Sequence, residues 1–128
     1  MEKLARQPRV IAAARLIRRR QTRFIDEDAR AFARVIQAMS TRPGLFRRRL
    51  KGAVDIPAQV HDDARRLGRL ARGVKRTIPP RYHVDLLCAE ALAEAAAQSA
   101  KALIMTNLAW LNEPAYAQRI RRRLASRS

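Results

Sequence analysis

The sequence predicts an all-α fold, a single compact bundle of about five to six helices around a central helix rich in alanine and leucine. Apolar residues recur at three- and four-residue spacing along almost the whole chain, and no segment alternates as a strand does. The 128 residues are enough for one core, so we expect a single helical domain, 1–128. A hydrophobic content of 48% supports a folded chain, although much of that content is alanine.

Two amphipathic helices are expected in the first third of the chain. The first begins near Pro8, a residue that suits the first helical position, and runs to about Gln21. The second begins at Asp26, which is a favourable N-cap residue. Its apolar residues share one face that we expect to point into the core: Phe32, Val35, Ile36 and Met39.

Glycine and proline divide the middle of the chain in this interpretation. A break at 40–44 precedes a short helix from Leu45 to Lys51, which Gly52 is expected to end. A further helix then opens at Pro57. It has apolar residues along one face and arginines along the opposite face.

The longest apolar helix is expected from about Val84 to Leu111. Between positions 82 and 113 the chain has four carboxylates and one lysine, so this segment is the natural centre of the bundle, and Trp110 is expected in the core. Its alanines and charges argue against a membrane span. Pro114 starts a final basic helix.

The chain is strongly basic, with 28 Lys and Arg residues against 11 Asp and Glu residues and a formal net charge of +17. Repulsion among so many cations opposes compaction, so the charge predicts a polyanionic partner. We expect nucleic acid, RNA and/or single-stranded DNA, held by its backbone phosphates. One Trp, two Tyr and three Phe offer no evident platform for stacking bases, so little sequence preference is expected.

Arginines supply the candidate binding residues. Four of them recur at three- and four-residue spacing after Pro57 and lie within about 60° of one another on a helical wheel, which makes a stripe suited to a row of phosphates. Others occur in basic clusters on the remaining helices. The full predicted nucleic-acid-binding set is Arg15, Arg18, Arg19, Arg47, Arg48, Arg65, Arg69, Arg72, Arg76, Arg119, Arg122 and Arg123.

No catalytic residue, metal ligand or cofactor site is predicted, and a non-catalytic protein is expected. His61 and His83 stand 22 positions apart without metal-ligand spacing, and we interpret both as surface or boundary residues. Asp62 and Asp63 are explained as acids in the first turns of a helix. Cys88 lies among apolar residues with no nearby cation, which favours a buried structural cysteine.

In general character the chain resembles the small helical subunits of CRISPR effector complexes. The resemblance rests on helices throughout 8–125, the absence of a catalytic signature, and the exposed stripe of Arg65, Arg69, Arg72 and Arg76. It implies several copies stacked along an RNA-bearing backbone, which hold strands by their phosphates while base pairing reads the sequence. The implied partners are other subunits of the ribonucleoprotein and further copies of the chain.

Other functions remain open at the level of sequence. One is a dimeric helical DNA-binding regulator or nucleoid-associated protein. Another is a small helical enzyme with an arginine-lined anion pocket. A lipid surface is less suited, because the basic faces lack large apolar anchors, so no membrane partner is expected. The N-terminal segment has no apolar stretch typical of a secretory signal, and a cytoplasmic location is expected.

Overall fold

A computed structural model describes residues 2–39 and 43–126, with side chains described from residue 8 onward. Within these ranges the chain is helical and contains no strand, which confirms the all-α prediction. The elements are α1 (Glu2–Met39), α2 (Pro43–Val74), the short 3-10 helix η1 (Pro80–Tyr82), α3 (His83–Leu111) and α4 (Pro114–Ser126). The expected count of five to six helices was wrong, because two expected breaks do not occur.

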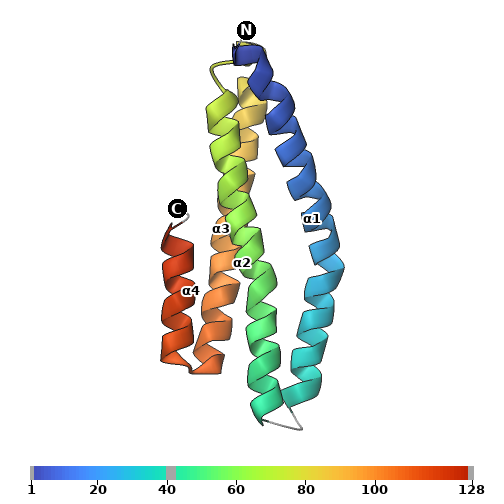
Figure 1. Cartoon of the computed structure of the whole chain (residues 1–128), viewed down its shortest axis with the longest axis vertical. Coiled ribbons are helices and arrows are strands. Elements are labelled where there is room, and N and C mark those ends of the chain that lie inside the picture. Colours follow the sequence, from blue (N-terminus) through green and yellow to red (C-terminus); the bar gives the residue numbers. More distant parts are fainter. Residues whose placement is uncertain (1, 40–42, 127–128) are drawn as a thin grey trace.

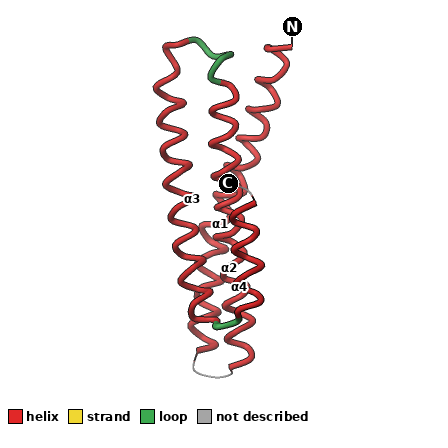
Figure 2. The backbone as a smooth tube through the Cα atoms, turned by 90° about the vertical axis from the view of Figure 1, so that its left-hand side faces the viewer, coloured by secondary structure: helices red, strands yellow, loops and turns green. Residues whose placement is uncertain are grey.

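The helices run close to the long axis of the molecule (Figures 1 and 2). α2 contacts α1, α3 and α4, so it is the element that the other helices surround. Figure 1 shows α1 on one side of α2 and α4 on the other, with α4 covering only the half of α3 next to their connection. α1 and α3 make the most extensive contacts with α2, and they lie along two different sides of it.

α1 is a single helix across the boundary expected before Asp26. Asp26 is an exposed residue inside the helix and not an N-cap. No glycine or proline occurs between positions 9 and 42, so nothing in the local sequence interrupts the backbone hydrogen bonds. The Thr22 hydroxyl donates to the Arg18 carbonyl at 2.9 Å. This contact between residues four apart forms within a continuous helix, so Thr22 does not end α1.

α2 is also continuous, although Gly52 and Pro57 were expected to divide it. Gly52 is exposed, and Pro57 is buried inside the helix. Proline in a helix interior costs roughly 3 kcal/mol in an isolated helix. Val54, three residues before Pro57, and Ala58, directly after it, are fully buried, and their burial against α3 and α4 offsets that cost.

Two clusters of buried residues hold the helices together. The first joins α2, α3 and α4 through Val54, Ala58, Ile104, Leu108, Ala117, Ile120 and Leu124. The second joins α1, α2 and α3 through Val35, Leu50, Ala53 and Leu111. Leu111 is followed by Asn112, which has a φ of 50° and donates its N–H to the Leu108 carbonyl at 3.2 Å. This left-handed residue ends α3 where the sequence predicted.

Several side chains expected in the core are exposed. Val35 is buried, but three neighbours on the same predicted face, and Trp110 on α3, are at least half exposed: Phe32 62%, Ile36 50%, Met39 52% and Trp110 63%. α1 packs mainly against α2, so only a narrow face of α1 is covered and the rest of its apolar stripe remains open. Cys88 is exposed too, so the prediction of a buried cysteine was wrong.

None of the helices in the described part of the chain is long and apolar enough to cross a membrane.

The exposure of Phe32 predicts a clear difference between two truncations. Ile104 is fully buried, so Ile104→Ala should lower the free energy of unfolding by about 2–5 kcal/mol. Phe32→Ala should change it by less than about 0.5 kcal/mol, as is usual for a surface position. Urea denaturation of both variants measures this, and equal losses would show that Phe32 is packed.

Candidate functional site

An open apolar groove runs between α1 and α3, with α2 as its floor. It combines two hollows of about 540 and 440 Å³ that share Gln21, Val60 and Ala96. We refer to this feature as the groove. Its principal apolar lining residues are Ile11 and Ile25 of α1, Val60 and Leu67 of α2, and Leu92 and Leu103 of α3.

The apolar walls follow from the spacing of residues on α1 and α3. Ile25, Phe32 and Ile36 lie on one side of α1, next to the face that contacts α2. Leu92 and Leu103 have the corresponding position on α3 and are 72% and 56% exposed. Since α1 and α3 flank α2, Ile25 of the first stripe and Leu92 and Leu103 of the second line the same opening.

Four polar side chains line the otherwise apolar groove. Gln21 and Asp28 come from α1, Asp63 from α2 and Ser99 from α3. Asp28 and Ser99 are exposed, whereas Asp63 is only 3% exposed. Apolar walls with a few polar groups are typical of small-molecule sites.

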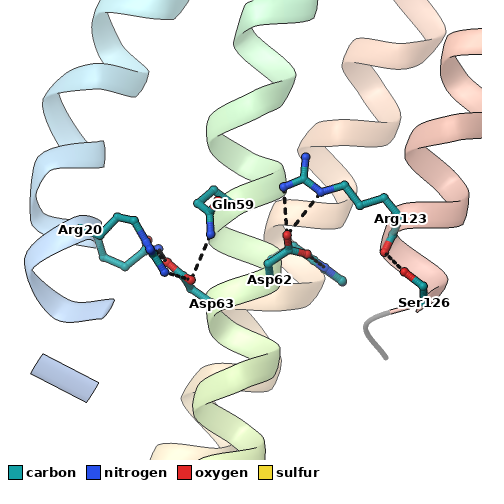
Figure 3. Close-up of polar contacts among 8 residues, drawn as sticks. Arg20, Gln59, Asp62, Asp63, Arg123 and Ser126 are labelled. Carbon is teal, nitrogen blue, oxygen red and sulfur yellow. Dashed lines mark hydrogen bonds and ion pairs between the residues drawn. The ribbon is translucent and has the colours of Figure 1, made fainter. Parts of the chain in front are cut away.

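Asp63 is the most strongly bound of these groups (Figure 3). Arg20 donates to both of its carboxylate oxygens, with Nε at 2.8 Å from Oδ2. Gln21 donates to Oδ2 at 2.8 Å, and Gln59 donates to Oδ1 at 3.2 Å. The hydrogen bond to Asp63 raises the pKa of Arg20. The contacts hold an ionised carboxylate in the floor of the groove and tie α1 to α2.

Asp62 points to the other side of α2 and binds α4. Arg123 donates to its Oδ2 from Nη2 at 2.9 Å and from Nε at 3.3 Å. Successive residues on a helix are about 100° apart, so adjacent aspartates can serve two different neighbours. Figure 3 shows Asp63 directed toward Arg20 and Asp62 toward Arg123. The interpretation of these acids as first-turn residues was wrong, because both lie buried within α2.

His61 is buried beside this pair and not at the surface. It is 5% exposed, and its Nδ1 lies 3.8 Å from Asp62 Oδ1 without a hydrogen-bond partner among the described residues. Burial lowers the pKa of His61; Asp62 opposes this effect, while Arg65 and Lys101 add to it. The imidazole is therefore neutral at pH 7. His83 is half-buried, with Nε2 at 3.1 Å from the Ile78 carbonyl oxygen.

The four arginines of the predicted stripe do not share one environment: two form ion pairs with α3, and two are exposed elsewhere. Arg65 Nη1 lies 3.0 Å from Glu94 Oε2, and Arg72 Nη1 lies 3.7 Å from Glu90 Oε2, so both pair with α3. Arg69 is exposed on the side of α2 that lies away from the groove. Arg76 is exposed in the turn that follows α2.

The other predicted arginines are spread over three helices. Arg123 is bound to Asp62, and the Arg119 guanidinium lies 5.6 Å from the centre of the Tyr116 ring. The remaining members are exposed: Arg15, Arg18 and Arg19 on α1, Arg47 and Arg48 at the start of α2, and Arg122 on α4. The structure does not gather the twelve into one patch.

Sequence reasoning missed the polar residues of the groove. Arg20 and Asp63 are 43 positions apart, so no local spacing relates them. The available signal was the position of Asp63 next to Ala64 and Leu67, on the apolar side of its helix. Among the described residues, no group of three or more His, Cys, Asp or Glu side chains is placed to hold a metal ion.

Loss of the Asp63 charge should strongly destabilise the fold. Asp63→Asn keeps the shape but removes the partner of the part-buried Arg20, so we expect a loss of about 3 kcal/mol in unfolding free energy. The control, Asp26→Asn, changes an exposed acid on α1 and should cost less than about 0.5 kcal/mol. Equal losses of unfolding free energy for the two variants in chemical denaturation would show that the Arg20–Asp63 pair does not stabilise the fold.

The buried His61 predicts a loss of stability in weak acid. In the unfolded chain its pKa is about 6.5, and in the folded chain it is lower, so the unfolded state binds more protons in between. Its contribution is complete above pH 6.5 and declines as the pH falls toward the folded pKa. Denaturation at pH 7.5 and 5.5 should therefore show a smaller change for His61→Gln than for the wild type. An unchanged difference would contradict a neutral buried imidazole.

Comparison with known proteins shows which family the chain matches. A sequence model of the formiminotransferase-cyclodeaminase family matches residues 2–126. No curated protein matches the chain, and no solved structure does.

This match overturns the resemblance to a CRISPR effector subunit and the nucleic-acid and ribonucleoprotein partners it implied. The alternative of a DNA-binding regulator has no support either. The physical error was to count arginines as free for phosphate when Arg65, Arg72 and Arg123 bind carboxylates of neighbouring helices. Because the match covers nearly the whole chain, the protein belongs to the formiminotransferase-cyclodeaminase family, which is named for an enzyme.

Proposed function

We propose that this chain is a folate-binding helical domain that holds its ligand in the groove and does not complete cyclodeamination by itself. The family name describes transfer of a formimino group and ring closure with loss of ammonia, which is chemistry of folate-borne one-carbon groups. The observation that carries the proposal is an open apolar groove with fixed polar groups in a member of that family.

The size and chemistry of the groove suit a folate. Its two hollows, about 540 and 440 Å³, fall within the usual range for small-molecule sites. A folate has a flat pterin ring and an aminobenzoyl group, which would lie against Val60, Leu92 and Leu103. Its anionic glutamate would remain near water, where the positive charge of the protein favours it.

Polar groups of the groove would orient the pterin ring. Gln21 donates its amide N–H to Asp63, which fixes the side chain and leaves its carbonyl oxygen to accept from a ring N–H. Asp28 on the same helix is exposed to the groove and offers a second acceptor. These contacts specify orientation, while the apolar walls supply most of the binding free energy.

The state of Asp63 supports binding without turnover. Its carboxylate already accepts four hydrogen bonds, from Arg20, Gln21 and Gln59, so both of its oxygens are engaged by side chains of the protein itself. The groove is open along one side, which leaves a bound ligand in contact with water. The proposal therefore keeps the expectation from the sequence that the chain is non-catalytic, and adds that it binds a ligand.

The test is calorimetric titration of the purified chain with tetrahydrofolate. Ala96 lines both hollows, so Ala96→Trp should fill the groove and weaken binding at least about tenfold. Ala91→Trp places the same bulk at an exposed position of α3 outside the groove lining and should bind like the wild type. Equal affinity of both variants, or no binding by the wild type, would contradict the proposal.

The catalytic part is tested separately with formiminotetrahydrofolate. The chain alone should bind this compound and release no ammonia above the rate in buffer. Ammonia release that Asp28→Asn abolishes, but Asp26→Asn retains, would contradict the non-catalytic assignment and identify Asp28 as the proton-transfer group. Asp26 is the matched control because it is exposed on the same helix and does not line the groove.

A further inference from the structure

A hollow that is not part of the groove lies on the other side of the contact between α1 and α2. Its volume is about 480 Å³, and its rim carries three arginines: Arg9 of α1, and Arg66 and Arg69 of α2. Val10, Leu70 and Val74 form its apolar wall, and Gly73 and Thr77 complete the lining. We refer to it as the anion pocket.

The anion pocket is separate from the groove. Val10, Leu70 and Val74 line both, so these side chains are the partition between the two. Arg66 and Gly73 occur only on the anion-pocket side, whereas Asp63 lines the groove side. A ligand in one hollow therefore need not occupy the other.

Positive charge is concentrated around the anion pocket. Arg9 and Arg66 are exposed, and neither forms a salt bridge with a described carboxylate. Bringing several guanidinium groups to one hollow costs repulsion, which a bound anion would relieve. Guanidinium groups also bind carboxylate and phosphate oxygens in pairs, a geometry that lysine cannot offer.

The absence of a side chain at Gly73 keeps the hollow open. A Cβ built at this position meets no atom within 4 Å, and the φ angle of Gly73 is not positive. A larger residue would therefore enter the hollow without backbone strain. Since glycine is about 1 kcal/mol less favourable than alanine within a helix, an open pocket here has a cost in stability.

We propose that the anion pocket binds a small organic anion with at least two carboxylate or phosphate groups. The anionic groups lie among Arg9, Arg66 and Arg69, and the carbon skeleton lies against Val10, Leu70 and Val74. A hollow of this size favours a compact anion over an extended polymer. The site does not depend on folate binding in the groove.

Calorimetric titrations with citrate and with pyrophosphate, at constant ionic strength, test the site. We expect one molecule of at least one of them per chain, and the stronger of the two shows whether carboxylate or phosphate is preferred. Acetate at the same ionic strength should give no saturable binding. Absence of saturable binding by both polyanions would overturn the proposal.

Two pairs of variants locate the binding. Gly73→Leu should block the hollow and weaken polyanion binding at least about tenfold without loss of thermal stability. Gly52→Leu, at an exposed glycine of the same helix with equally free space, should have no effect on binding. Arg66→Gln should weaken binding, whereas Arg48→Gln, also exposed on α2, should not. Equal effects within each pair would mean general attraction to the +17 charge and would overturn a defined site.

A competition experiment tests whether the groove and the anion pocket bind their ligands independently. Saturating citrate or pyrophosphate should leave the affinity for tetrahydrofolate unchanged within about twofold, because the partition of Val10, Leu70 and Val74 separates them. Mutual exclusion would overturn the separate site. Failure of tetrahydrofolate to bind would contradict only the proposed function, since polyanion binding is measured independently.

Discussion

The pair of adjacent buried aspartates in α2 is the interaction on which the arrangement of the helices depends. Asp63 binds Arg20 of α1, and Asp62 binds Arg123 of α4. α1 has only a narrow apolar face against α2, so the Asp63 contact fixes its position along and around that helix. The same contact places Gln21 in the groove. The hydrogen bonds to Asp63 that hold α1 against α2 therefore also fix the position of Gln21 in the candidate site.

The distribution of charge follows from this arrangement. A chain with +17 charge must place many arginines, and some of them bind carboxylates between helices, as Arg65 does with Glu94. Those that remain surround apolar hollows and extended surfaces, where they favour anionic ligands. A folate has an anionic glutamate and two ring systems, so the positive charge of the protein and the apolar walls of the groove would both favour its binding. The proposal of a folate as the ligand rests on membership of the formiminotransferase-cyclodeaminase family.

The sequence predicted α3 and α4 well because their limits are local. Pro79, Asn112 and Pro114 stop or start helices by backbone geometry alone. Gly52 and Pro57 carry the same local signals, but burial of their neighbours outweighs them, and this depends on helices distant in sequence. The candidate site was missed for the same reason. It is assembled across three helices, and the spacing of residues along one helix does not show which residues of the other two lie beside them.

Hydrogen–deuterium exchange with and without tetrahydrofolate tests most directly whether the groove is the ligand site. Bound ligand should slow exchange in the stretches of α1 and α3 that line it, 21–28 and 96–103, because contacts there oppose local opening. α4 lies on the other side of α2 and should exchange at the same rate in both samples. Protection confined to α4, or no protection at saturating ligand, would contradict a folate site between α1 and α3.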